Sequence, residues 1–163
     1  MVRNTAGRRK ARERGSEVIE FTLMLFGILG FLFLTIDIAW MVFCRANLQT
    51  SVREGARYAA VTARDFKGKP VENVTAIQAR VQQFSFGFLT GKNALITVNW
   101  YDPKHTSTPL TVSDACTFNV DCANGTGNLV EVSVENYPAR PLLYVFHDPK
   151  PFWFTARSLD RME

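Results

Sequence analysis

The sequence predicts an α+β fold, in which a long N-terminal transmembrane helix extends into an outer domain with a second helix and a small antiparallel sheet. Three observations lead to this fold class: an apolar run near the N-terminus, helical periodicity directly after it, and short segments of alternating hydrophobicity further on. With 163 residues, 47% of them hydrophobic, the chain has room for one modest domain besides a membrane helix.

The apolar run is the predicted transmembrane helix, residues 18–44. No charged residue occurs from Phe21 to Ile36, and the stretch from Phe21 to Cys44 would rise about 35 Å as a helix, enough to cross a bilayer. The alternative is a secretory signal peptide. The run is longer than the apolar part of such signals, and no small-residue cleavage site follows it promptly, so we favour the anchor.

Basic residues before the run predict its orientation. Residues 1–15 should stay in the cytoplasm, with residues 45–163 on the outer side of the membrane. The net charge of +4 is concentrated in this leader and the rest of the chain is close to neutral, so no nucleic-acid partner is expected. The basic residues of the leader are Arg3, Arg8, Arg9, Lys10, Arg12 and Arg14.

The helical pattern continues beyond the membrane segment, through residues 45–64. An apolar stripe recurs there at steps of three or four residues, no proline interrupts it, and Gly55 is a position where the helix could bend. Because the stripe consists mostly of small residues, it suits close packing against a sheet or another helix. It consists of Leu48, Val52, Ala56, Ala59 and Ala63.

A second helix and three strands are expected in the rest of the outer domain. Apolar residues at helical spacing predict a helix from Val71 to about Ser85. Alternating patterns predict strands over residues 94–101 and 129–137, and the β-prone segment 151–159 predicts a third.

A long polar loop, residues 102–128, separates the first two strands. Loops of this length are typically functional or disordered. It contains Cys116 and Cys122, which we predict to form a disulfide on the outer side of the membrane, with two free thiols as the alternative. Cys44 is left over, and we expect it to be a small buried residue.

No motif for catalysis or metal binding is present. His105 and His147 are the only histidines, and neither has a carboxylate or cysteine at a ligand spacing. We therefore expect no enzymatic activity, no cofactor and no metal.

Two acids border or enter the apolar run. Glu20 lies at its inner boundary, where it could simply be an interfacial residue, and Asp37 lies in its outer half. An ionised carboxylate at membrane depth costs several kcal/mol without a partner. If the chain were cut between Gly15 and Ser16, the new α-amino group of Ser16 could pair with Glu20 of a neighbouring copy and set the register between subunits.

These residues carry a resemblance to a known family. A basic leader, a glycine, four residues, a glutamate and an apolar helix resemble type IV pilins, and "GSEVIEF" fits this arrangement. More narrowly, "GSEVIEFTLMLFGILGFLFLTIDIAW", "LQTSVREGARYAAV" and "FWFTARSLDRME" resemble the TadE-like family of the tight-adherence (Flp) pilus system.

The resemblance implies a minor pilin or pseudopilin with a pilin-like outer domain that takes part in assembling an adhesive type IV pilus. It implies leader cleavage by a prepilin peptidase between Gly15 and Ser16, with Glu20 as the recognition and register acid. Major pilins of the system commonly have tyrosine after this glutamate, where this chain has Phe21, so a minor subunit fits better.

The implied location is the bacterial inner membrane, crossed once, with the outer domain in the periplasm or carried into an extracellular pilus. The implied partners are other pilins, pilus assembly proteins, the prepilin peptidase and membrane lipid. Asp37 is either solvated by headgroups or contacts a neighbouring helix, for example through Arg45. The rival function is an uncleaved, membrane-anchored binding or adhesion module that uses the 102–128 loop.

Overall fold

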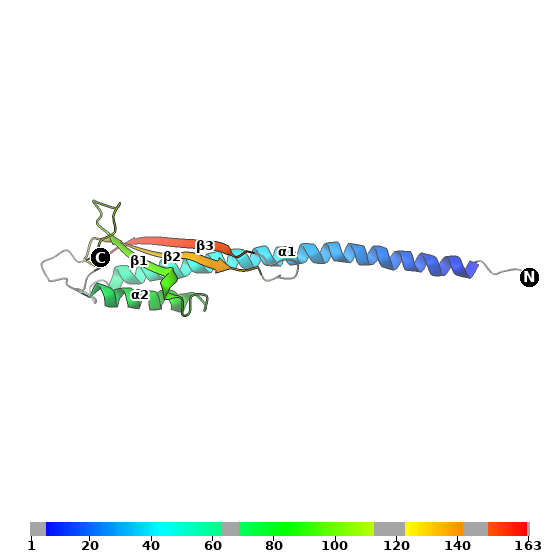
Figure 1. Cartoon of the computed structure of the whole chain (residues 1–163), viewed down its shortest axis with the longest axis horizontal. Coiled ribbons are helices and arrows are strands. Elements are labelled where there is room, and N and C mark those ends of the chain that lie inside the picture. Colours follow the sequence, from blue (N-terminus) through cyan, green and yellow to red (C-terminus); the bar gives the residue numbers. More distant parts are fainter. Residues whose placement is uncertain (1–5, 63–68, 113–122, 142–149, 163) are drawn as a thin grey trace, which may run out of the picture.

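The protein consists of one long helix whose C-terminal half forms part of a compact α+β domain (Figure 1). The computed structural model describes residues 6–62, 69–112, 123–141 and 150–162, with the backbone alone for residues 6–16. The elements in chain order are α1 (Ala6–Thr62), α2 (Pro70–Phe84), a short 3-10 helix (Asn93–Leu95), β1 (Ile96–Tyr101), β2 (Leu129–Ala139) and β3 (Phe152–Arg161). The predicted fold class and the element order are confirmed.

Helix α1 is continuous over 57 residues, which corresponds to about 85 Å. It runs without interruption through Gly55, where α2 comes close. A Cβ atom at Gly55 would collide with Cγ2 of Val81 on α2 and would lie 3.5 Å from Cγ1 of Val132 on β2. Gly55 therefore allows α1 to approach the rest of the domain closely.

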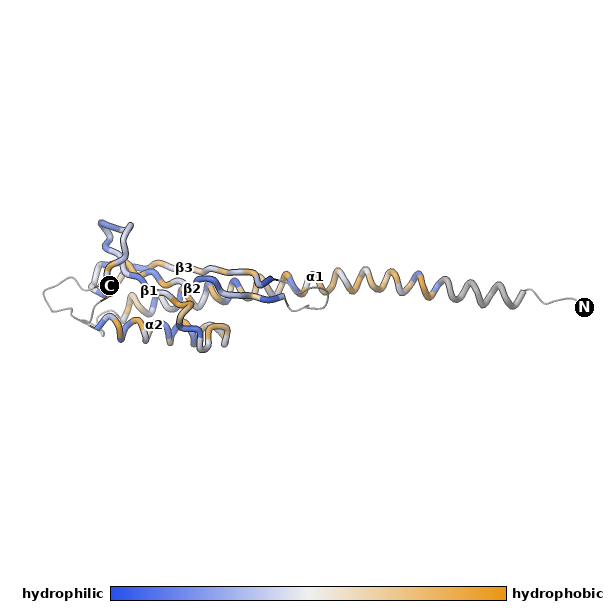
Figure 2. The backbone as a smooth tube through the Cα atoms, viewed as in Figure 1, coloured by the Kyte–Doolittle hydropathy of each residue, from blue (hydrophilic) through white to orange (hydrophobic). Residues whose placement is uncertain are grey.

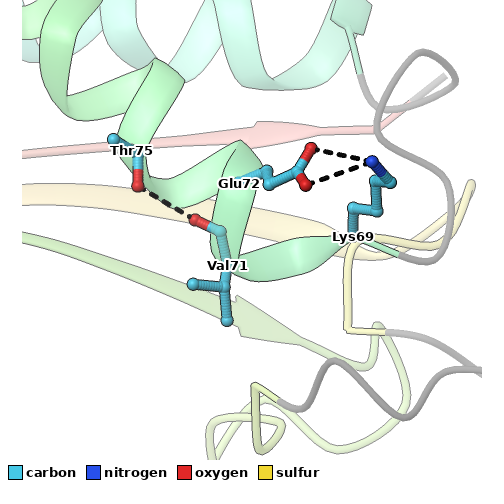
Figure 3. A network of polar contacts seen from close by, with 4 residues as sticks. All are labelled: Lys69, Val71, Glu72 and Thr75. Atoms are coloured by element: carbon cyan, nitrogen blue, oxygen red, sulfur yellow. Dashed lines mark hydrogen bonds and ion pairs between the residues drawn. The ribbon is translucent and has the colours of Figure 1, made fainter.

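The start of α2 is marked by Pro70, whose missing N–H group costs nothing in the first turn of a helix. Lys69 forms an ion pair with Glu72 in that turn, with Nζ 3.1 Å from Oε1, and the carboxylate also suits the positive end of the helix dipole (Figure 3). The Thr75 hydroxyl donates to the Val71 carbonyl at 3.2 Å. These contacts are exposed, so burial of the other side of α2 carries more of its stability.

The sheet has the order β1-β2-β3, and both pairings are antiparallel. The predicted alternation holds in the central part of the sheet, since Val98 pairs with Val132 and Val132 pairs with Ser158 in one continuous register. The β2–β3 register shifts between Val134 and Tyr137, where Asn136 has a φ of 53°. This irregularity brings Tyr137 onto the buried side at the end of β2.

The core lies between the sheet and the outer half of α1, with α2 packed beside α1. Trp100 of β1 is the largest fully buried side chain, and Leu48 of α1 is next. Ala56 and Ala59 are buried as the stripe predicted, which lets helix and sheet approach closely, and Ala63 lies outside the described residues. The main members of the core are Leu48, Val52, Ala56, Ala59, Ile77, Val81, Leu89, Ile96, Val98, Trp100, Val130, Val132 and Val134.

Candidate functional site

The N-terminal half of α1 exposes apolar side chains around its whole circumference. From Val18 to Phe43 the large hydrophobic residues of α1 are mostly exposed, and Figure 2 shows this stretch as the most hydrophobic part of the helix. This helix is long and apolar enough to cross a membrane, and it lies near the N-terminus. A helix that is apolar on all sides is typical of a membrane span.

The hydroxyl groups inside this span are satisfied within the helix. The Thr22 hydroxyl donates to the Val18 carbonyl at 2.7 Å, and Thr35 donates to Phe31 at 2.9 Å. Neither hydroxyl therefore needs a water molecule as a partner. Polar groups inside the hydrocarbon core of a membrane have to be satisfied within the protein in this way. A Cβ atom placed on Gly27 or Gly30 would meet nothing within 4 Å, so this part of α1 is open to lipid or to another helix.

The predicted cleavage and register residues lie together on α1. Gly15 and Ser16 have helical backbone, and the Glu20 side chain is exposed. Ser16 and Glu20 are four residues apart, so they occupy one face of the helix, about one turn apart. Their functional roles stay predictions, because the pairing partner would be a second copy.

Asp37 lies near the opposite end of the span. It is half-buried, about 25 Å along the helix from Glu20 and one turn before Trp40. It therefore lies near the outer boundary of the bilayer if Glu20 lies near the inner one. The two predicted environments of its carboxylate, lipid headgroups or a residue such as Arg45 of another copy, both stay predictions.

The cysteine predictions have different outcomes. Cys44 is buried, with 2% of its surface exposed, as expected. Cys116 and Cys122 lie outside the described residues, and their disulfide stays a prediction.

The first part of the 102–128 loop begins with a tight turn. The His105 N–H donates to the Asp102 carbonyl at 2.9 Å, and the Lys104 N–H donates to Asp102 Oδ1 at 2.9 Å. The Lys104 amide, and after it His105, lowers the pKa of the Asp102 carboxyl. Residues 113–122 of the loop lie outside the described residues, so its role in ligand binding stays a prediction.

Polar pairs link neighbouring strands on the outer surface of the sheet. The Tyr101 hydroxyl donates to Glu131 Oε2 at 2.8 Å, and this bond raises the pKa of Tyr101. Arg157 pairs with Glu135, with Nη2 2.8 Å from Oε1. Neither pair buries a charged group fully, so both can form without a large loss of hydration.

A metal site would require at least three His, Cys, Asp or Glu side chains close together. Among the described residues, no such group is found. His105 is exposed, 3.3 Å from the Asp102 carboxylate through Nδ1, and His147 lies outside these ranges. The expectation that the chain has no enzymatic activity stays untested.

One feature that the sequence pattern did not predict is an aromatic contact between the span and the domain. The Phe88 ring, in the loop after α2, lies 5.8 Å from Trp40 and 6.2 Å from Phe43 on α1, between ring centroids. It also lies 6.2 Å from Tyr137 at the end of β2, where burial raises the tyrosine's pKa. The alternating "FSFGF" at residues 84–88 was the available signal.

Comparison with protein families gives a match to TadE-like protein over residues 15–57, about a quarter of the chain. This is the family that the sequence resembles, and the matched segment lies wholly within α1. The match links the chain to the tight-adherence pilus system and implies association with its assembly components. Comparisons with curated proteins and with solved structures gave no match.

Proposed function

We propose that this chain, TadE-like over residues 15–57, is a minor pilin or pseudopilin of a tight-adherence (Flp) type IV pilus. The observation that carries the proposal is the coincidence of the matched segment with one helix. The segment begins at Gly15, the residue before the proposed cut, and runs through the exposed apolar surface of α1 into the core of the outer domain.

The proposed mechanism is lateral association of helices, with no catalysis by this chain and no cofactor. Before assembly, α1 holds the subunit in the bacterial inner membrane, with the outer domain in the periplasm. Moving an apolar helix from lipid to a neighbouring helix changes little apolar exposure, so packing and polar contacts decide whether it associates. The open surface at Gly27 and Gly30 allows such packing.

The polar contact that we propose to set register forms only after processing. A prepilin peptidase cuts between Gly15 and Ser16, and the new Ser16 amine of one subunit pairs with the Glu20 carboxylate of the next. Charge pairs are strong where the dielectric constant is low, and an acid at membrane depth is costly without such a partner. The exposed Glu20 side chain on a bare stretch of helix is accessible to a neighbouring copy.

The cut is tested by mass spectrometry of the full chain extracted from membranes of cells that have an active prepilin peptidase. We expect Ser16 as the first residue. An intact amino terminus on a membrane-inserted chain would overturn the processing step and favour the rival function, an uncleaved binding or adhesion module.

The register acid is tested by Glu20→Ala, with Glu17→Ala as the matched control. Glu17 is exposed on the same helix, one turn closer to the N-terminus, so both variants remove one carboxylate from the same region. We expect both variants to insert into the membrane, but only Glu20→Ala to lose incorporation into sheared pili. Equal incorporation of the two variants would remove the register role from Glu20.

A further inference from the structure

Three aromatic side chains at one end of the outer domain are exposed without an evident role in folding. The exposed fractions are 82% for Phe86, 55% for Phe152 and 61% for Trp153. Beyond the apolar span, these are the exposed Phe and Trp side chains of the described part of the chain. We call them the aromatic rim. They come from two segments far apart in sequence, the loop after α2 and the start of β3.

Contacts with α1 fix the height of the rim along the helix. Phe88, two residues after Phe86, packs against Trp40 and Phe43, and on its other side it meets Tyr137. Tyr137 pairs with Phe154, the neighbour of Trp153 in β3. Figure 1 shows the same arrangement, since β2 ends and β3 begins on the side of the domain that faces the free half of α1.

That height corresponds to the outer edge of a bilayer crossed by α1. From Phe21 to Trp40 the helix rises about 29 Å, which is close to the thickness of the hydrocarbon core. The rim therefore lies where the hydrocarbon meets the headgroups. Tryptophan and other aromatic residues are enriched at this depth, because their rings are apolar and can still meet polar groups.

Basic side chains accompany the rim. Lys92 lies with Nζ 4.7 Å from the centroid of the Tyr137 ring, Arg140 directly follows β2, and Lys150 precedes β3 by two residues. All three are exposed, as is Arg45 on α1. Lysine and arginine beside a membrane are attracted to anionic headgroups.

The size of the rim favours lipid over a second protein. At 150–250 Å² for a whole aromatic side chain, the three exposed fractions amount to about 400 Å². A stable protein interface takes about 800 Å² from each partner. Contact with a membrane surface can be stable with a smaller area, because α1 already holds the domain beside the membrane.

We propose that the aromatic rim docks into the phospholipid interface of the membrane that α1 crosses, with the basic side chains Arg45, Lys92, Arg140 and Lys150 at the lipid phosphates. The outer domain then contacts the bilayer through three segments: α1, which crosses it, and the Phe86 loop and the start of β3, which lie at its surface. The inference requires α1 to cross the membrane, but neither leader cleavage nor a place in a pilus.

The test places tryptophan as a probe in the full chain, reconstituted at one copy per nanodisc. The lipid is brominated phosphatidylcholine with phosphatidylglycerol, and bromine quenches tryptophan that enters the bilayer. In a Trp40→Phe variant, Trp153 reports on the rim, while Trp100 is fully buried in the core and gives a constant background. We expect the Trp153 emission to be lower in brominated than in unbrominated lipid, because a tryptophan at the interface lies within contact of the lipid chains.

The matched control moves the probe along the same strand. The variant Trp40→Phe/Trp153→Phe/Leu159→Trp keeps one exposed tryptophan on the same face of β3, about 20 Å further from the membrane. We expect no quenching there. Equal emission from Trp153 in brominated and unbrominated discs would overturn the proposal.

Two further measurements separate the alternatives. If Trp153 were protected from aqueous iodide only at several copies per vesicle, the rim would be a contact between copies and the proposal would fail. If Trp40 in a Trp153→Phe variant were not quenched, α1 would not place the rim at the bilayer, which also overturns it. Pilus incorporation of the same variants, measured in cells, reports separately on the proposed pilin function.

Discussion

Gly55→Ala is the sharpest test of how α1 is built into the outer domain. On an exposed helix surface this substitution would stabilise the protein by about 1 kcal/mol, because alanine is a better helix former than glycine. At Gly55, however, the new methyl group would collide with Cγ2 of Val81. Val81 is fully buried and β-branched, so it has little freedom to turn away.

The cost follows from the packing on both sides of the new methyl group. To restore ordinary contact, α1 and α2 would have to separate by about 1 Å. Movement in another direction is blocked by Cγ1 of Val132, 3.5 Å away. Overpacking of this kind costs about 1–3 kcal/mol, so after the gain in helix propensity we expect a net loss of about 1 kcal/mol.

The assay is urea unfolding of the full chain in a mild detergent, followed by the emission of the buried Trp100 in a Trp40→Phe/Trp153→Phe background. The control is Gly27→Ala, because nothing lies within 4 Å of that position, and it should not lower stability. In a Val81→Ala background, Gly55→Ala should become neutral or stabilising, because the colliding methyl group is gone. Gly55→Ala as stable as the parent chain would refute the close approach of α1 and α2.

Three further predictions concern the sheet and the core. Leu48→Ala should lower the free energy of unfolding by about 2–5 kcal/mol in the same urea assay, because Leu48 is 1% exposed and belongs to the core between α1 and the sheet. Arg157→Ala should lower it by at most about 1 kcal/mol, since its ion pair with Glu135 is exposed. The pKa of Tyr101 is raised in the folded protein, so its hydrogen bond to Glu131 contributes fully to stability below a pH of about 10. This contribution is lost as the pH rises through the folded pKa. Tyr101→Phe should therefore remove this alkaline loss of stability, measured by urea unfolding at a series of pH values.

The elements of the fold could be predicted because each leaves a local periodic pattern. Val98 and Val132 alternate with polar neighbours in the sequence, and in the structure they pair across β1 and β2 on the buried face. The same holds for Leu48 and Val52, whose helical spacing placed them in the core. Periodicity identifies a buried face, whatever covers it.

The contacts between elements could not be predicted in the same way. The sequence predicts Gly55 as a possible bend, whereas in the structure Gly55 allows a close approach to Val81, which lies 26 positions later in the sequence. The packing of Phe88 on Trp40 likewise depends on how α2 returns along α1. The sequence can mark such residues as small or aromatic, but it does not predict which residue of another element each will contact.

The candidate site was predictable to a different extent. The spacing from Gly15 to Glu20 is a linear signal, which sequence alone carries, and the family match begins at Gly15. The partner of Glu20 in our proposal is another copy, so the fold of a single chain cannot reveal it. The aromatic rim is the opposite case: Phe86 and Trp153 are inconspicuous in sequence and form a surface only because the loop after α2 and the start of β3 lie at one level of α1.

The continuity of α1 links these two proposals physically. No loop separates the apolar stretch of α1 from the core, since Phe43 is about half exposed and the next residue, Cys44, is already buried in the domain. A rigid helix transmits any axial shift, so moving α1 outward by one turn, about 5.4 Å, lifts the rim from the lipid interface by the same amount. If the subunit enters a pilus as we propose, its helix has to rise out of the bilayer, and the rim then leaves the lipid interface with it. Lipid contact at the rim would therefore oppose this step of assembly.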